Sequence, residues 1–136
     1  MTRYLLDTNI LSDAIKRPFG AVAERIKTEA EESLVLSAIV LAELRFGARR
    51  ISSTQIADRI DALESQLQVL PFGPPADHAY ADIRTDLQRR GVVIGANDML
   101  IAAQAVAADI ILVTDNVGEF RRVAGLRVEN WLRPDP

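Results

Sequence analysis

The chain has 136 residues, of which 49% are hydrophobic and 5% aromatic, so it is long enough for one domain with a core of Leu, Ile, Val and Ala. It has no cysteine and one histidine, which excludes disulfides, thiolate metal sites, Cys nucleophiles and a multi-histidine zinc site. The net charge of −3 argues against a simple basic nucleic-acid binder, although acids that await a cation also lower the formal charge.

The sequence shows no feature of an exported or membrane protein. Arg3, Asp7, Asp13 and Lys16 interrupt the N-terminal stretch, so no signal-peptide apolar region is expected there. No apolar run approaches the roughly 20 residues needed to cross a bilayer. The sequence therefore predicts a soluble, cytoplasmic protein with no membrane contact.

Short apolar strands alternate with helices along the whole chain. In chain order, the predicted elements are a strand at 4–6, helices at 10–15 and 21–31, a strand at 34–36, helices at 39–50 and 53–68, a strand at 69–72, helices at 76–90 and 97–108, and a strand at 110–114. A loop with a short helical turn is predicted after Asn116, followed by a last strand at 126–131. Thr8 or Asn9, Ser37, Ser53 and Asn97 are placed to cap helices. This alternation predicts one α/β domain over residues 1–136, with a central, mostly parallel five-stranded sheet flanked by helices on both faces.

Four acids lie inside apolar segments or at their edges. Asp7 and Asp115 follow predicted strands, Asp98 lies in the first turn of a helix, and Glu43 lies within a helix. A carboxylate beside a core is normally paired or bound to a cation, because an unpaired one costs several kcal/mol or becomes protonated. Strand ends of an open α/β sheet form the edge where ligands bind. The four acids therefore predict one shared cation, and oxygen ligands favour Mg²⁺ or Mn²⁺.

Each acid also has an ordinary structural alternative. Asp7 and Asp115 could be cap or turn residues, and the helix macrodipole favours an acid at Asp98. Glu43 could form a salt bridge with Arg45 or Arg84. Three polar residues flank the acids and could hydrogen-bond them or a metal-bound water, or simply cap helices: Thr8, Thr114 and Asn116.

The ordered set of motifs resembles the PIN-domain ribonucleases, and most of all their VapC branch, the toxins of type II toxin–antitoxin pairs. The resemblance spans essentially the whole chain. It rests on Asp7-Thr8-Asn9, Ala42-Glu43-Leu44, the stretch 95–102 around Asp98, Val113-Thr114-Asp115-Asn116 and the closing stretch 119–131. Each motif is weak alone, and the order makes the set specific.

The resemblance implies a PIN-like fold and a metal-dependent endoribonuclease that hydrolyses RNA phosphodiester bonds and inhibits translation and growth. It assigns metal binding first to Asp7 and Asp98, with Glu43 and Asp115 completing the acidic pocket. Many relatives carry Asn at the position of Asp115, which makes that acid auxiliary. The implied partners are RNA, with tRNA as one candidate, a VapB-type antitoxin whose C-terminal segment occupies the active-site groove, and a second copy in a homodimer within a larger complex.

Phosphodiester hydrolysis gives the four acids distinct expected roles. Asp7 and Asp98 would ligate the principal Mg²⁺ or Mn²⁺, Glu43 would orient or deprotonate the attacking water or share the metal, and Asp115 would hold a second ion or a metal-bound water. Two alternatives belong to other classes of protein. One is an aspartate-based phosphatase-like domain, and the other is a catalytically inactive PIN-like binding module whose acids only cap helices or contact an antitoxin.

Overall fold

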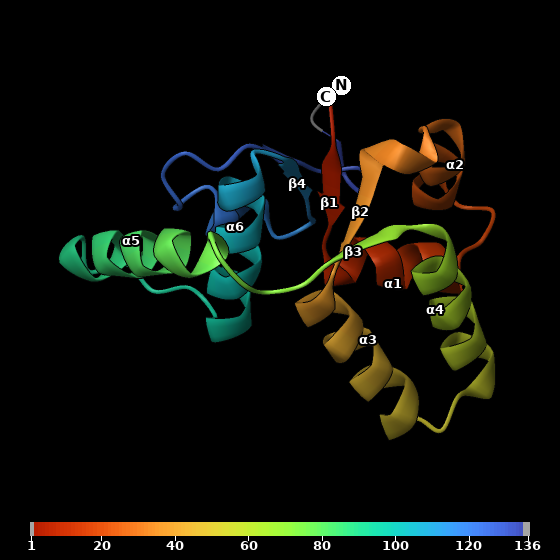
Figure 1. The fold of residues 1–136 in the computed structure, drawn as a ribbon. Helices are drawn as coiled ribbons and strands as arrows, with labels where there is room; N and C mark the ends of the chain where they lie inside the picture. The colour runs from red at the N-terminus through yellow and green to blue at the C-terminus, as the bar shows by residue number, and fades with distance from the viewer. Residues whose placement is uncertain (1, 135–136) are drawn as a thin grey trace.

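Five parallel strands form one sheet in the computed structural model, which describes residues 2–134 (Figure 1). The strands are β1 (Tyr4–Leu6), β2 (Leu34–Ser37), β3 (Gln68–Leu70), β4 (Ile111–Val113) and β5 (Val128–Glu129). Their order across the sheet is β3-β2-β1-β4-β5, and all four neighbouring pairs are parallel. The predicted five-stranded parallel sheet is confirmed.

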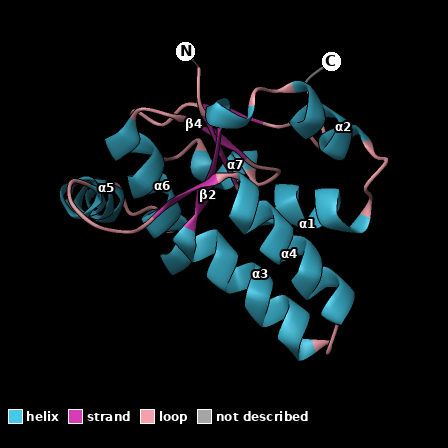
Figure 2. Cartoon of the chain, turned by 45° about the vertical axis from the view of Figure 1, so that its right-hand side comes forward, coloured by secondary structure: helices cyan, strands magenta, loops and turns pink. Residues whose placement is uncertain are grey.

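Two groups of helices flank the strands. The helices are α1 (Thr8–Lys16), α2 (Ala21–Thr28), α3 (Ala38–Arg50), α4 (Thr54–Gln66), α5 (Ala76–Arg89), α6 (Ala96–Ala108) and α7 (Val117–Phe120), with a short 3₁₀ turn at Glu31–Ser33. Helices α1 to α4 lie on one side of the strands in Figure 1, and α5 packs on α6 on the other side. Figure 2 shows α3 and α4 side by side as a helical hairpin that projects from the sheet.

The strands at the centre of the sheet are largely buried, which explains why they read as unbroken apolar runs. Leu5 and Leu6 of β1 and Leu112 and Val113 of β4 have no exposed surface. A parallel sheet covered by helices on both faces requires apolar residues at successive positions. Phe120 of α7 joins the same core and is also fully buried. In residues 2–134, no helix is long and apolar enough to cross a membrane.

Two predicted helix caps are confirmed and two are wrong. Ser37 accepts hydrogen bonds from the first turn of α3, and Ser53 accepts one from Ile56 N–H in α4. Helix α1 begins earlier than predicted, because Asp7 rather than Thr8 or Asn9 is its N-cap. Helix α6 begins at Ala96 with Gly95 before it, so Asn97 lies within the helix.

The topology brings the ends of β1 and β4 together. From β1 the chain moves outward to β2 and β3, and it returns to place β4 on the opposite side of β1. Leu6 pairs with Val113, and Asp7 N–H donates to Val113 O at 2.9 Å. The sheet therefore reverses its strand order beside Asp7, which is the point where open α/β sheets bind ligands.

Candidate metal centre

Asp7 is a buried carboxylate at the end of the central strand. Only 5% of its surface is exposed. Its Oδ1 accepts a hydrogen bond from Thr8 N–H at 2.8 Å, which caps α1, and its Oδ2 accepts one from the buried Thr114 hydroxyl at 2.7 Å. Asp7 is therefore both the N-cap of α1 and the residue that follows the end of β1. The capping role alone does not explain the burial, because an exposed Asp caps a helix equally well.

Thr8 links Asp7 to Glu43. While its backbone N–H donates to Asp7, its hydroxyl donates to Glu43 Oε1 at 2.8 Å, across 35 positions of sequence. The alternative salt bridges of Glu43 are not formed among the described residues. Arg45 instead pairs with two acids of α4, and Arg84 donates to the Tyr80 hydroxyl. Glu43 is therefore a half-buried acid without a cationic partner in residues 2–134.

Asp98 lies in the first turn of α6 and contacts an acid that the sequence reasoning had missed, Glu119 of α7. The two carboxyl groups hydrogen-bond each other. Glu119 Oε1 also accepts Gly95 N–H at 2.7 Å, and its Oε2 accepts the Asn116 side-chain amide. The approach is close at Gly95, because a Cβ there would lie 3.3 Å from Asp98 Oδ2.

Four acids influence one another electrostatically at this end of the sheet. Burial, then the hydrogen bond and charge of Glu119, and then the charges of Asp7 and Glu43, raise the pKa of Asp98 to about 8. Burial also raises the pKa of Asp7, and the charges of Glu43 and Glu119 add to this against the hydrogen bonds from Thr114 and Thr8. The pKa of Glu119 is lowered, mainly by its hydrogen bond from Asp98. Like charges held together in this way favour protonation or a bound cation.

Asp115 faces a different set of partners from the other predicted acids. Its Oδ1 accepts a hydrogen bond from the Asn130 side-chain amide at 3.0 Å and lies 3.4 Å from Arg133 Nε. The structure thus groups Asp7, Glu43 and Asp98 with Glu119, and it places the Asp115 carboxylate against the C-terminal segment. Among the expected supporting residues, Thr8 contacts Asp7 and Glu43, Thr114 contacts Asp7, and Asn116 contacts Glu119.

The grouped acids have the chemistry of a divalent-cation site but do not form a closed cage. In residues 2–134, no three acidic or histidine side chains stand close enough to hold an ion as they are. They are linked in pairs, Asp7 with Glu43 through Thr8, and Asp98 with Glu119 directly. This group offers one buried carboxylate and three further carboxylates, and it contains no nitrogen or sulfur donor. Such a donor set fits Mg²⁺ or Mn²⁺, which take oxygen ligands and keep several waters.

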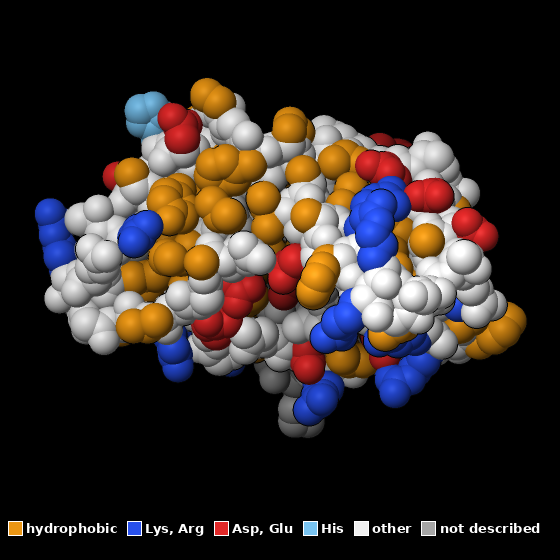
Figure 3. Space-filling model, turned by 90° about the horizontal axis from the view of Figure 1, so that it is seen from below, with side chains coloured by type: hydrophobic (Ala, Val, Ile, Leu, Met, Phe, Trp, Pro, Cys, Tyr) orange, Lys and Arg blue, Asp and Glu red, His pale blue; other side chains and the backbone are white. Residues whose placement is uncertain are grey.

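A groove opens beside the acids between α1, α3 and α4. It has a volume of about 720 Å³ and begins at Thr8, Glu43 and Asn97. Its far part is lined by apolar side chains, among them the exposed Phe46 and Ile51, and by two cations, Lys16 and Arg50. Figure 3 views the molecule from the end at which β1 terminates and shows acidic side chains near the middle of this face, with Lys and Arg side chains to their right.

The raised pKa of Asp98 predicts a pH-dependent stability for the metal-free protein. Its folded pKa of about 8 lies above the ordinary 3.8, so the folded state holds the proton more tightly than the unfolded state. Stability is then greatest below the unfolded value and is lost as the pH rises through about 8. Urea unfolding in EDTA should show this fall for the wild type and a smaller fall for Asp98→Asn. A control, Asp109→Asn at an exposed site, should keep the wild-type slope, and an equal slope in Asp98→Asn would contradict the prediction.

Fold and site together define an α/β protein with a carboxylate centre of the metal-dependent nuclease type at the switch point of a parallel sheet. The PIN domain family matches residues 4–126, and the chain belongs to that family, in its VapC ribonuclease branch. It is accordingly a nuclease of the hydrolase class. The relatives give no support to the phosphatase-like alternative or to the inactive binding module.

The similarity extends over nearly the full length of each relative. Ribonuclease VapC2 of Rickettsia felis is 36% identical over 130 residues, with 94% of this chain and 97% of that protein covered. The tRNA(fMet)-specific endonuclease VapC of Shigella flexneri is 35% identical, with 96% and 99% covered. The structure of DNA-bound VapBC from Salmonella typhimurium has a TM-score of 0.89 at 31% identity, with 96% and 99% covered.

Proposed function

We propose that this chain is the toxin of a VapBC-type pair and an endoribonuclease that uses Mg²⁺ or Mn²⁺ held by Asp7, Asp98, Glu43 and Glu119. The observation that carries the proposal is the mutual electrostatic influence of these acids, centred on a carboxylate that is only 5% exposed. Such a group is tolerable when ionised if a cation shares the site. The expectation that Asp115 also serves the metal stays a prediction, which Mn²⁺ binding by Asp115→Asn tests.

The residues around the site give each acid a definite task. When bound, a divalent cation stabilises charge on the phosphate oxygens and makes water more acidic. Asp7 is held rigidly by Thr8 and Thr114, so it fixes the position of the centre. Glu43 is oriented by the Thr8 hydroxyl and lies at the groove, where its carboxylate can accept a proton from the attacking water.

The groove beside Glu43 offers a path for an RNA strand. Lys16 and Arg50 line it and can contact phosphates, which positions a strand without reading its sequence. The relatives named for tRNA(fMet) cleavage support a structured RNA, and tRNA in particular, as substrate. The apolar part of the same groove suits the C-terminal segment of a VapB-type antitoxin, and the VapBC structures support such a partner. We further propose a homodimer that joins a larger toxin–antitoxin complex in the cytoplasm.

Cleavage of RNA by the purified chain tests this proposal. Total tRNA and an unstructured RNA should be incubated with Mg²⁺, with Mn²⁺ and with EDTA, and the new 5′ ends mapped. Cleavage at a few defined positions with either cation and none in EDTA is expected. Cleavage that continues undiminished in EDTA would contradict the metal-dependent proposal.

A further inference from the structure

The turn between β4 and α7 (residues 114–116) has two faces, and one of them contacts the grouped acids Asp7 and Glu119. The Thr114 hydroxyl donates to Asp7 Oδ2 at 2.7 Å. Asn116 donates its side-chain amide to Glu119 and its backbone N–H to Thr114 Oγ1 at 3.0 Å. Two residues of one turn therefore hold two of the carboxylates, so a shift of this turn would disturb the hydrogen bonds that place Asp7 and Glu119.

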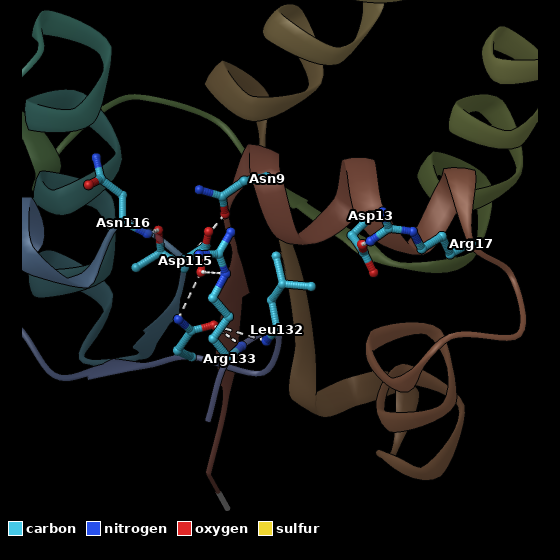
Figure 4. Close-up of polar contacts among 9 residues, drawn as sticks. Asn9, Asp13, Arg17, Asp115, Asn116, Leu132 and Arg133 are labelled. Atoms are coloured by element: carbon cyan, nitrogen blue, oxygen red, sulfur yellow. Dashed lines mark hydrogen bonds and ion pairs between the residues drawn. The ribbon is translucent and has the colours of Figure 1, made fainter. Parts of the chain in front are cut away.

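The other face of the turn is held by residues distant in sequence, through Asp115. Its backbone N–H donates to Asn9 Oδ1 at 3.1 Å, and its carboxylate accepts from Asn130 and pairs with Arg133. Figure 4 shows the Asp115 side chain beside Arg133, with Asn9 close to the same residue, whereas the Asn116 side chain extends away from them.

Hydrogen bonds within the C-terminal segment orient Asn130 for this contact. Asn130 Oδ1 accepts the backbone N–H groups of Leu132 and Arg133 at 2.9 and 3.0 Å, which leaves its side-chain amide free to donate to Asp115. The Asp115 side chain is 23% exposed, so its hydrogen bonds are partly shielded from water. The contact is therefore an ordered polar clasp between residues 130–133 and the turn.

We propose that Asp115 is a positioning residue, which clasps the C-terminal segment to the turn that holds Asp7 and Glu119, and that it does not ligate the metal. This inference rests on the proposed nuclease function. The oxygen of Asp115 that faces the segment is already engaged by an amide and a guanidinium. Groups that orient metal ligands through hydrogen bonds commonly contribute tenfold or more to activity.

Three variants test the clasp by its effect on kcat, on KM for RNA and on Mn²⁺ activation. Asp115→Ala should lower kcat about tenfold, with KM and the Mn²⁺ requirement little changed. Asp115→Asn should restore most of the loss, because its side-chain oxygen still accepts from Asn130. Asn130→Ala should resemble Asp115→Ala, and the double variant should be no worse than Asp115→Ala, since both single variants remove the same hydrogen bond between Asn130 and Asp115.

Asp109→Asn is the matched control, because Asp109 pairs with Arg127 at 3.0 Å on the exposed surface, away from the turn. Its left-handed backbone also suits Asn. It should keep wild-type kcat. If Asp115→Asn is as inactive as Asp98→Asn and loses Mn²⁺ binding, Asp115 is a ligand and the inference fails. If both Asp115→Ala and Asn130→Ala keep full kcat, the inference also fails while the nuclease function stands. Absence of cleavage by the wild type would overturn the proposed function and this inference together.

Discussion

Asp98→Asn should abolish RNA cleavage, by about a thousandfold or more, and leave the fold intact. Asn keeps the shape of Asp98 but carries no charge, so it is a poor ligand for a divalent cation. Its amide can still donate a hydrogen bond to Glu119, which now receives one from Asp98. The variant also removes a carboxyl group whose ionisation is opposed by burial and by three neighbouring acids. In metal-free buffer above about pH 8, it should therefore be more stable than the wild type.

Single-turnover cleavage of the mapped RNA, together with urea unfolding in EDTA, measures both effects for Asp98→Asn. Asp109→Asn again provides an exposed acid that should change neither. A folded Asp98→Asn protein that cleaves RNA at the wild-type rate would contradict the assignment of this residue. An Asp98→Asn protein that does not fold would show that Asp98 is required for the structure.

Replacement of Asp7 should separate its two roles. Asp7→Asn and Asp7→Ala should both lose cleavage by about a thousandfold, because neither side chain supplies a charged ligand. Asn retains an oxygen that can cap α1 through Thr8 N–H, whereas Ala removes the cap and leaves the buried Thr114 hydroxyl without its acceptor. Losing a cap costs about 1 kcal/mol, and a buried unsatisfied group costs about 1–3 kcal/mol. Asp7→Ala should therefore be the less stable of the two by a few kcal/mol.

Ser53→Ala is the control for the capping role of Asp7. It removes the side-chain cap of α4, which accepts Ile56 N–H at 3.1 Å, at a position remote from the acids. It should lose about 1 kcal/mol of stability and keep its cleavage rate. Activity retained by Asp7→Asn, or lost equally by Ser53→Ala, would mean that Asp7 acts only as a cap.

The sheet could be predicted from the sequence because its central strands are buried on both faces. The runs around Leu5 and Leu112 are continuous and apolar, and each is separated from the next by a helical pattern. The edge strands were less well predicted. Strand β3 begins at Gln68 and β5 has two residues, so neither carries a clear apolar period. The strand order required the structure, because periodicity says nothing about which strands are neighbours.

The candidate site was predicted in part for a similar reason. Acids at strand ends and in the first helical turn, such as Asp7 and Asp98, are placed by topology, and topology follows from the element pattern. Topology does not determine the direction of a side chain in a turn, so this direction could not be predicted. Thr114 and Asp115 follow a strand as neighbours, and their side chains point in opposite directions. The Thr114 hydroxyl therefore contacts Asp7 in the site, whereas the Asp115 carboxylate contacts Asn130 in the C-terminal segment.

Glu119 was missed as a site residue although a short helical turn was predicted after Asn116, because a helix of four residues is too short for its sequence pattern to show which side chain faces the site. Its signal was local and weak, an acid three positions after Asn116 in a segment already linked to the site. Its carboxylate reaches Gly95 and Asp98, which lie more than 20 positions earlier in the chain. Contacts between distant short elements of this kind leave no periodic trace in the sequence.

Calorimetric titration with Mn²⁺ above about pH 8, where Asp98 is ionised, tests the central claim of one shared cation site most directly. Wild type, Asp109→Asn and Asp115→Asn should bind Mn²⁺ with similar affinity, whereas Asp7→Asn and Asp98→Asn, each folded, should show no comparable binding. Equal binding by the wild type and Asp98→Asn, or no binding by any of them, would contradict the claim that these acids hold one ion together.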